Sequence, residues 1–266
     1  EYHLVDNPRV REIVFEGGTL FTEGELADLI ETREGMILNH AMVSADRKDM
    51  EGFYIRSGYS LVRVYSIFDP DDRRLVFKID EGRINNIILE GNKRTKAWAV
   101  TRHVPFNPGD IFQQKKAERG VEDLYGTDLF ETVRFLAAPD TIGITLKVLV
   151  TEKSYNILRS GARFDLEYGS KAFIDIVDDN LFGAGLELYL STTVGEKRRS
   201  MSLDFEADRI WNSLYTYRLF IDYGEFKRNY YIDHEYNGYL REFHHGGVLS
   251  LGRQIPRLGT ISIVGQ

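Results

Sequence analysis

Residues 125–133 read Tyr-Gly-Thr-Asp-Leu-Phe-Glu-Thr-Val and lie between a helical pattern and an alternating strand pattern. A looser copy, Tyr-Ile-Arg-Ser-Gly-Tyr-Ser-Leu-Val, lies 71 residues earlier, at residues 54–62. Similar stretches that recur at a fixed spacing and in similar contexts indicate an internal repeat. We therefore expect two copies of one structural unit in this chain.

The strand pattern that would open each unit recurs as well. The first copy, Val10, Ile13, Val14, Glu16 and Gly17, returns 74 residues later as Ile84, Ile87, Ile88, Glu90 and Gly91. Glu81 maps onto Glu152 at a spacing of 71. These spacings predict one unit at residues 9–82 and another at residues 83–153. Residues 1–8 would be the end of a preceding unit or a linker, because residues 4–7 resemble the end of a unit's last strand.

Each unit has the same expected order of elements, β-α-α-β-β. The expected strands are 10–16, 61–68 and 73–79, then 84–90, 131–137 and 144–151; the expected helices are 22–31 and 44–57, then 96–104 and 113–126. The second helix of each unit carries an apolar stripe, formed by Met50, Phe53 and Tyr54 or by Ala117, Val121, Leu124 and Tyr125. Such a stripe needs a sheet to cover it, so the units are expected to be α+β.

Residues 154–266 show a different, two-residue period. Leu186, Leu188 and Leu190, for example, alternate with more polar residues, as do Met201 and Leu203. Strands of about ten residues with this alternation are typical of an antiparallel transmembrane β-barrel, and a soluble sheet with one solvated face is the alternative. The expected strands are 155–168, 171–178, 184–194, 199–209, 214–226, 235–252, with a bend or break at Gly246 and Gly247, and 259–266. An open edge in lipid leaves backbone groups unpaired, so we expect the N-terminal part of an incomplete barrel.

Composition argues against several kinds of site. The chain has no cysteine, so thiol chemistry and disulfides are excluded. Its net charge of -7 argues against a nucleic-acid partner. The six histidines lack the spacing of a metal site, and no nucleophile elbow or phosphate-binding glycine loop occurs. We therefore expect no metal, no cofactor and no enzyme activity.

Two motifs resemble those of a known family. Residues 180–185, Asn-Leu-Phe-Gly-Ala-Gly, resemble the turn near the start of the barrel in the BamA/TamA-like outer-membrane protein assembly factor family. Residues 125–133 resemble the Tyr-x-Thr-Gly-x-Phe-x-x-Val stretch of that family's polypeptide-transport-associated (POTRA) domains, with Asp128 where glycine is usual. The family's late-barrel Val-Arg-Gly-Tyr/Phe-like motif does not occur in these 266 residues.

The resemblance implies the role of an outer-membrane protein assembly factor, with its POTRA domains in the periplasm and its barrel in the bacterial outer membrane. Unfolded barrel proteins would be received by β-augmentation on POTRA edge strands and inserted through a barrel seam. The implied client-binding residues are Leu61, Arg63, Tyr65, Ile67, Thr132, Arg134 and Leu136. The implied seam residues are Tyr155, Ile157, Arg159 and Gly161, and the implied family turn residues are Asn180, Leu181, Phe182, Gly183 and Gly185.

The implied partners are unfolded outer-membrane proteins, outer-membrane lipid and periplasmic accessory lipoproteins. Three alternatives stay open. The chain could belong to a POTRA-barrel secretion transporter, to the POTRA-barrel part of a patatin-like phospholipase autotransporter, or to a soluble periplasmic binding module.

Overall fold

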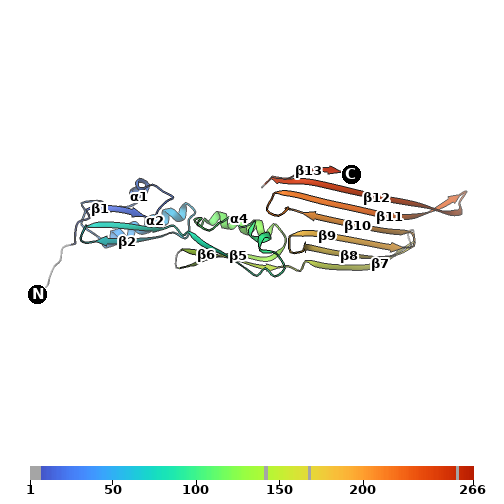
Figure 1. The fold of residues 1–266 in the computed structure, drawn as a ribbon, viewed down its shortest axis with the longest axis horizontal. Helices are drawn as coiled ribbons and strands as arrows, with labels where there is room; N and C mark the ends of the chain where they lie inside the picture. Colours follow the sequence, from blue (N-terminus) through green and yellow to red (C-terminus); the bar gives the residue numbers. More distant parts are fainter. Residues whose placement is uncertain (1–6, 141–142, 167–168, 256–257) are drawn as a thin grey trace. The chain divides into compact units, whose positions relative to one another are not determined.

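The computed structural model describes residues 7–140, 143–166, 169–255 and 258–266 (Figure 1). Most of the expected linker at 1–8, and the predicted strand end at Tyr168, lie outside these residues. The chain forms two compact units. One comprises residues 1–88, 104–122 and 134–148, and the other comprises residues 89–103, 123–133 and 149–266.

The first repeat has the predicted β-α-α-β-β order. Its elements are β1 (Glu12–Glu16), α1 (Glu23–Leu29), α2 (His40–Arg56), β2 (Arg63–Asp69) and β3 (Arg74–Asp80). The strand order is β1-β3-β2, with β1 parallel and β2 antiparallel to β3. Helix α2 begins earlier than the predicted residue 44, because the Asn39 side chain accepts the amide hydrogens of Ala41 and Met42 as an N-cap.

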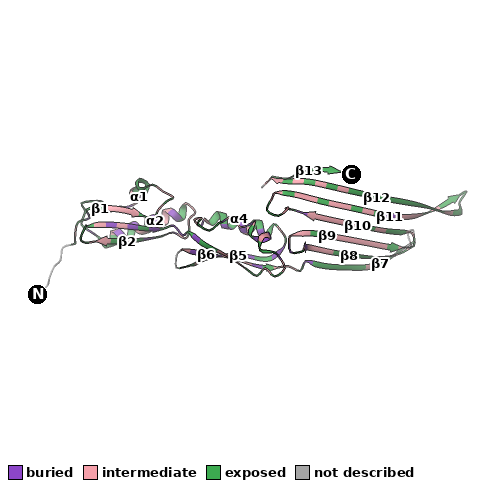
Figure 2. Ribbon diagram, in the orientation of Figure 1, coloured by how far each residue is buried: buried purple, intermediate pink, exposed green. Residues whose placement is uncertain are grey.

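The predicted apolar stripe of α2 forms the core of this repeat (Figure 2). Met50 and Tyr54 of the helix, and Leu75 and Phe77 of the central strand, are at most 1% exposed and belong to one cluster. Burial of such side chains contributes roughly 1.5–3 kcal/mol each. The helix therefore covers one face of the sheet and leaves the other face to solvent.

The second repeat has the same order: β4 (Ile84–Glu90), α3 (Ala97–Thr101), α4 (Gln114–Tyr125), β5 (Phe130–Pro139) and β6 (Ile144–Glu152), with strand order β4-β6-β5. Ala117 and Leu124 of the predicted α4 stripe are buried. Tyr125 was expected in that stripe but is 45% exposed, since it ends the helix. Its hydroxyl instead accepts the amide hydrogen of Val133 at 3.1 Å, within the stretch at residues 125–133 that repeats.

The repeated Glu-Gly pair turns the chain where the first strand of each repeat ends. Gly17 and Gly91 have φ values of +84° and +97°, in the left-handed region that favours glycine. An added Cβ would lie 2.4 Å from the Ile79 carbonyl oxygen at Gly17 and 1.9 Å from that of Val150 at Gly91. Glycine is needed at both positions for backbone conformation and for the close approach of the last strand.

Seven strands follow the repeats in one antiparallel sheet, in chain order (Figure 1). They are β7 (Asn156–Asp165), β8 (Gly169–Leu181), β9 (Leu186–Gly195), β10 (Arg198–Ala207), β11 (Tyr215–Ile232), β12 (Glu235–Ile255) and β13 (Gly259–Gly265). The suggested break at Gly246 and Gly247 does not occur, because both glycines keep their register partners on β11. Strand β11 continues past the predicted end at 226, since β12 remains paired with it up to the hairpin turn.

The register separates the two faces of this sheet. One cross-strand row is Ile176, Leu190, Leu203 and Ile221. The neighbouring row on the opposite face is Asp175, Ser191, Ser202 and Asp222. The predicted alternation therefore becomes one apolar and one polar face, as in part of an outer-membrane barrel wall.

Among the described helices, none is long and apolar enough to cross a membrane.

Substitution of Gly91 by alanine should destabilise the protein strongly, because the new Cβ would collide with the Val150 carbonyl oxygen. Gly109 is the matched control: its φ is +98°, but nothing lies within 4 Å of its added Cβ. Gly109→Ala should cost only the left-handed strain of about 1–2 kcal/mol. Urea unfolding followed by circular dichroism compares the two variants, and equal losses of stability would contradict the steric role of Gly91.

Candidate functional site

The predicted client-binding strands are sheet edges. β2 pairs only with β3, and β5 only with β6, within the strand orders of the two repeats. Tyr65 and Ile67 on β2 are 47% and 55% exposed, and Leu136 on β5 is 48% exposed. Arg63, Thr132 and Arg134 are exposed on the same faces, while Val64 and Val133 point to the other side and are buried. Each edge thus combines open backbone groups with an exposed apolar and cationic surface.

Leu61 does not belong to this edge surface. It precedes β2, is half-buried, and packs against the cluster of Ile84, Phe112 and Leu146 from the second repeat. The family resemblance implied Leu61 as a client-binding residue, but its contact with the next repeat takes it out of the exposed row. Leu61 therefore joins successive repeats.

The predicted seam strand β7 is an edge of the seven-stranded sheet. Ile157, Arg159 and Gly161 lie on one face of it, where the Arg159 guanidinium lies 5.9 Å from the centre of the Tyr189 ring. Gly161 leaves room for the Phe173 ring, since an added Cβ would lie 2.7 Å from two of its carbon atoms. Gly161 therefore gives β7 a cross-strand packing contact with β8.

Tyr155 was expected on the seam strand but lies one residue before β7 and is only 5% exposed. Its hydroxyl donates to the Leu129 carbonyl oxygen at 3.0 Å. The side chain is therefore an anchor to the second repeat.

Tyr155 belongs to a chain of buried hydrogen bonds between the second repeat and the sheet. Because its one hydroxyl hydrogen goes to Leu129, the Thr95 hydroxyl must donate to Tyr155 at 3.0 Å. The Asn180 side-chain amide in turn donates to the Thr95 hydroxyl at 2.8 Å. Each hydroxyl in this chain is both donor and acceptor, so removal of one leaves its neighbours unsatisfied.

The predicted family turn at 180–185 supplies the other half of this junction. The Asn180 side-chain oxygen accepts the Gly185 amide hydrogen at 2.8 Å, and the Gly183 carbonyl accepts that of Lys96 at 2.8 Å. Gly183 has φ +69°, and a Cβ there would lie 2.1 Å from the Arg94 carbonyl oxygen. The turn closes the β8–β9 hairpin and docks on the loop that precedes α3.

Glu152 fixes the shape of that loop. Its carboxylate accepts the amide hydrogens of Lys93, Arg94 and Thr95 at distances of 2.7–3.1 Å. Burial raises the pKa of Glu152, but the hydrogen bonds from Thr95, Arg94 and Lys93 outweigh it, and the pKa lies below its usual value. The Glu81 carboxylate likewise accepts the amides of Thr19 and Leu20 in the first repeat. The sequence match of Glu81 with Glu152 is the signal in the sequence that corresponds to this shared role.

Two arginines complete the junction. Arg94 donates to Asp178 at 2.5 Å and to Asn156 at 2.6 Å, which places it on the first hairpin of the sheet. Arg102 lies 5.4 Å from the centre of the Trp98 ring and donates to the Trp211 carbonyl in the β10–β11 turn at 2.8 Å. The second repeat is thus held to two turns at the same end of the sheet. No sequence motif marked either arginine.

His103 is buried beside this contact. Its Nε2 accepts a hydrogen bond from Arg102 at 3.1 Å. Burial is the main cause, and the charges of Arg209 and Arg102 add to it, so that together they lower the pKa of His103 to about 3. The imidazole is neutral near pH 7 for this reason.

Within the described ranges, no group of three or more histidine, aspartate or glutamate side chains could hold a metal ion.

The profile described as "POTRA: Surface antigen variable number repeat" matches residues 8–82 and 83–153. The chain belongs to the POTRA family. It is 23% identical over 220 residues to the putative outer membrane protein assembly factor of Treponema pallidum, covering 77% of this chain and 26% of that protein. It is 24% identical over 224 residues to the outer membrane protein assembly factor BamA of Nitratidesulfovibrio vulgaris, covering 79% of this chain and 28% of that protein.

Solved structures resemble both the repeats and the sheet. A BamA from Haemophilus ducreyi lacking POTRA domains 1–3 gives a TM-score of 0.54 at 18% identity, covering 93% of this chain and 48% of that one. CdiB from Escherichia coli gives 0.53 at 16% identity, covering 96% of this chain and 52% of that one. The chain therefore shares its fold with these structures: two POTRA units followed by an open antiparallel sheet that matches part of each solved chain. The chain spans about half of these structures and roughly a quarter of the curated relatives.

Thr95→Val keeps the shape of the side chain but removes the hydroxyl that links Asn180 to Tyr155. We expect a loss of about 1–3 kcal/mol in stability, because buried polar groups are left unsatisfied. Thr132→Val is the matched control, since its hydroxyl bonds that of Thr151 at 2.8 Å on an exposed surface. It should cost at most about 0.5 kcal/mol. Equal losses of stability for the two variants in chemical unfolding would show that the chain of buried hydrogen bonds does not stabilise the protein.

Acid should destabilise the protein through His103. Because its pKa is lower in the folded than in the unfolded state, its contribution is complete above about pH 6.5 and is lost as pH falls toward about 3. His103→Gln should therefore lose less stability than the wild type over this range. Unfolding midpoints measured across it test this, with His40→Gln as the control for an exposed histidine. Parallel curves for wild type and His103→Gln would contradict the expectation.

Proposed function

We propose that this chain is the POTRA and early-barrel portion of an outer-membrane protein assembly factor. Its POTRA repeats would lie in the periplasm and receive unfolded barrel proteins, which the barrel would insert into the outer membrane. The observation that carries the proposal is the repeated open edge, β2 and β5, with exposed apolar and cationic side chains in both copies. The assembly-factor names of the relatives in Treponema pallidum and Nitratidesulfovibrio vulgaris support the same function.

Open edges suit a client that is still unfolded. An extended segment can add to β2 or β5 as a further strand, because its backbone hydrogen bonds do not depend on its sequence. Tyr65, Ile67 and Leu136 then offer apolar contacts to alternate client side chains, and Arg63 and Arg134 offer contacts to client carboxylates. A surface of this kind would accept many barrel proteins and reject compact ones.

The β7 edge is the proposed seam. Its outward backbone groups would be unpaired in lipid unless another strand covers them, which costs several kcal/mol per group. A client strand that pairs with β7 would relieve that cost, so the edge would serve as a template. Ile157, Arg159 and Gly161 are the residues of β7 that we assign to this role.

The contacts between the second POTRA repeat and the sheet would fix the geometry between client receipt on the repeat and client insertion at β7. Asn180, Thr95 and Arg102 hold the second POTRA repeat to turns of the sheet. Delivery and insertion by this route make or break no covalent bond, so we propose no enzyme activity. Outer-membrane lipid and periplasmic accessory lipoproteins remain proposed partners.

A secretion transporter is the second candidate, since CdiB from Escherichia coli resembles the chain with nearly the same TM-score as the BamA structure. A transporter of that kind would serve a dedicated passenger, whereas an assembly factor would serve many barrel proteins. The range of clients therefore separates the two.

Photo-crosslinking in cells tests the proposal. A crosslinking amino acid at Tyr65 or Leu136 should capture several different unfolded outer-membrane proteins, because both positions lie on exposed edges. Asp49, exposed on α2, is the control position and should capture few of them. Capture of a single secreted passenger would favour the transporter, and equal capture at Asp49 would contradict delivery along the edges.

A further inference from the structure

The apolar face of the seven-stranded sheet ends at a defined position along β11. Tyr215, Tyr217, Leu219, Ile221 and Tyr223 follow one another on this face, and Glu225, Lys227 and Asn229 come next. Residues 215–223 span about 21 Å along the normal at a tilt of about 40°, close to the roughly 25 Å apolar band of outer-membrane barrels. The lipid-facing band therefore ends between Tyr223 and Lys227, at the end of the sheet away from the junction turns.

Near this position the strands end unevenly, because β11 and β12 continue beyond the start of β10. β10 begins at Arg198, opposite Phe226, and the last link to β11 beyond it is the hydrogen bond from the Lys227 amide to the Lys197 carbonyl, 2.8 Å long. Beyond that point β11 pairs only with β12, so the β11–β12 hairpin rises above the short β9–β10 turn. A cavity of about 950 Å³ lies over the turn, beside the hairpin.

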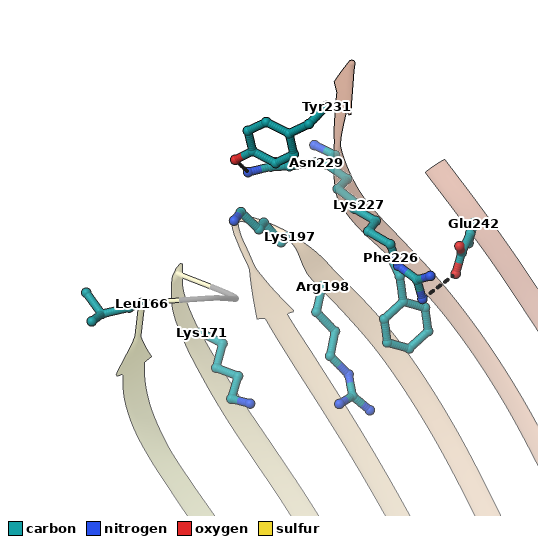
Figure 3. A pocket seen from close by; sticks show the side chains of 10 residues that line it. Leu166, Lys171, Lys197, Arg198, Phe226, Lys227, Asn229, Tyr231 and Glu242 are labelled. Atoms are coloured by element: carbon teal, nitrogen blue, oxygen red, sulfur yellow. Dashed lines mark hydrogen bonds and ion pairs between the residues drawn. The ribbon is translucent and has the colours of Figure 1, made fainter. Parts of the chain in front are cut away.

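Cations dominate the lining of this cavity, which we call the rim notch. They are Lys171, Lys197, Arg198, Lys227 and Arg228, drawn in Figure 3 with the other lining residues Leu166, Phe226, Asn229, Tyr231 and Glu242. Glu242 is the one carboxylate among the lining residues, and it pairs with Arg228 at 3.4 Å. The notch therefore has an excess of positive charge in a chain whose net charge is -7.

On the apolar face, two cations lie opposite one another at the same position along β11 and β12. Lys227 is directly opposite Arg241 in the β11–β12 register, and both lie over the Tyr239 ring, at 5.6 and 5.4 Å from its centre. Like charges opposite one another destabilise a sheet. Glu225, 3.8 Å from Arg241, offsets only part of this charge. Lys227 also lines the notch, so an anion bound there would offset the charge of Lys227.

We propose that the rim notch binds the phosphate-bearing headgroup of an anionic lipid of the outer leaflet. The notch is lined from both faces of the sheet: Lys227 comes from the apolar face, and Lys171 and Arg198 come from the polar face. A headgroup at the end of the apolar band reaches Lys227 while its acyl chains stay along that band. Polar aromatic side chains and cations at this depth are the groups that favour headgroups.

This inference rests on the proposed membrane location of the sheet. The test uses protein extracted from its native membrane in mild detergent and titrated with phosphatidylglycerol or with zwitterionic phosphatidylcholine, with bound lipid counted by native mass spectrometry. We expect preferential binding of phosphatidylglycerol. Arg198→Gln/Lys227→Gln should weaken it about 30-fold, since each cation near a lipid surface contributes on the order of a fivefold effect.

Two further variants make the test specific. Lys48→Gln/Arg56→Gln removes the same charge from exposed positions on α2 and should leave phosphatidylglycerol binding unchanged. Arg198→Lys/Lys227→Arg keeps the charge and should retain binding, which separates loss of the site from loss of the fold. Sodium phosphate alone is the third arm. Binding of free phosphate with the same dependence on the variants, and without preference for phosphatidylglycerol, would make the notch a site for a soluble anion and overturn the proposal.

Failure of the proposed function and failure of this inference give different results. A protein absent from the membrane fraction would contradict the proposed function together with this inference. A membrane-embedded protein that binds both lipids equally, or whose lipid preference survives Arg198→Gln/Lys227→Gln, would overturn the inference alone.

Discussion

Thr95 lies where the second repeat, the strand that leaves it and the β8–β9 turn of the sheet meet. Its hydroxyl receives the Asn180 amide and donates to Tyr155, and its backbone amide is held by Glu152. A buried polar chain of this kind is stable only when every member has its partner. The position of β7 and β8 relative to the loop before α3 therefore depends on a few directional bonds.

The carboxylate that shapes this loop is part of the repeat itself. Glu81 binds the amides of Thr19 and Leu20 in the first repeat just as Glu152 binds those of Arg94 and Thr95 in the second. In each case the last strand of the repeat thereby holds the entry to the helices, next to a glycine that admits its backbone. In the first repeat Arg83 extends this arrangement by donating to the Thr19 hydroxyl at 2.6 Å. In the second repeat, Asn180 donates to Thr95 in the corresponding loop. The same carboxylate-bound loop therefore contacts Arg83 in the first repeat and the β8–β9 turn in the second.

The two sheets of the repeats and the barrel sheet use open backbone edges in different surroundings. In the repeats, helices cover one face and the edges β2 and β5 face water, which can satisfy their backbone groups. Among the described residues, no helix follows β7, and under the proposed membrane location an edge of the seven-stranded sheet would have no such solvent. If the proposed function holds, the same strand geometry would serve as an adaptable binding surface in the repeats and would require a partner strand in the membrane.

The sequence alone determined the repeats, the β-α-α-β-β order and the antiparallel character of the last strands. These follow from local periodicity, turn residues and a fixed spacing, all of which act over short distances along the chain. Asp128 illustrates the limit: it replaces the usual glycine of the repeat motif yet keeps a positive φ of 57°, and it pairs with Lys153 within the second repeat. The sequence shows the replacement, and only the structure shows that the backbone conformation is kept.

Only the tertiary structure decided where the edges end and what the motif turn contacts. Leu61 and Tyr155 looked like members of exposed strands, but contacts with a neighbouring repeat bury them in part or almost completely. Arg94, Thr95 and Arg102 carry no periodic signal, because their partners Asp178, Asn180 and Trp211 are 84–109 residues away in the chain. Patterns with a short period report which face a residue is on, whereas pairing between distant loops depends on how the strands register and turn. That register placed the junction at one end of the sheet and the rim notch at the other.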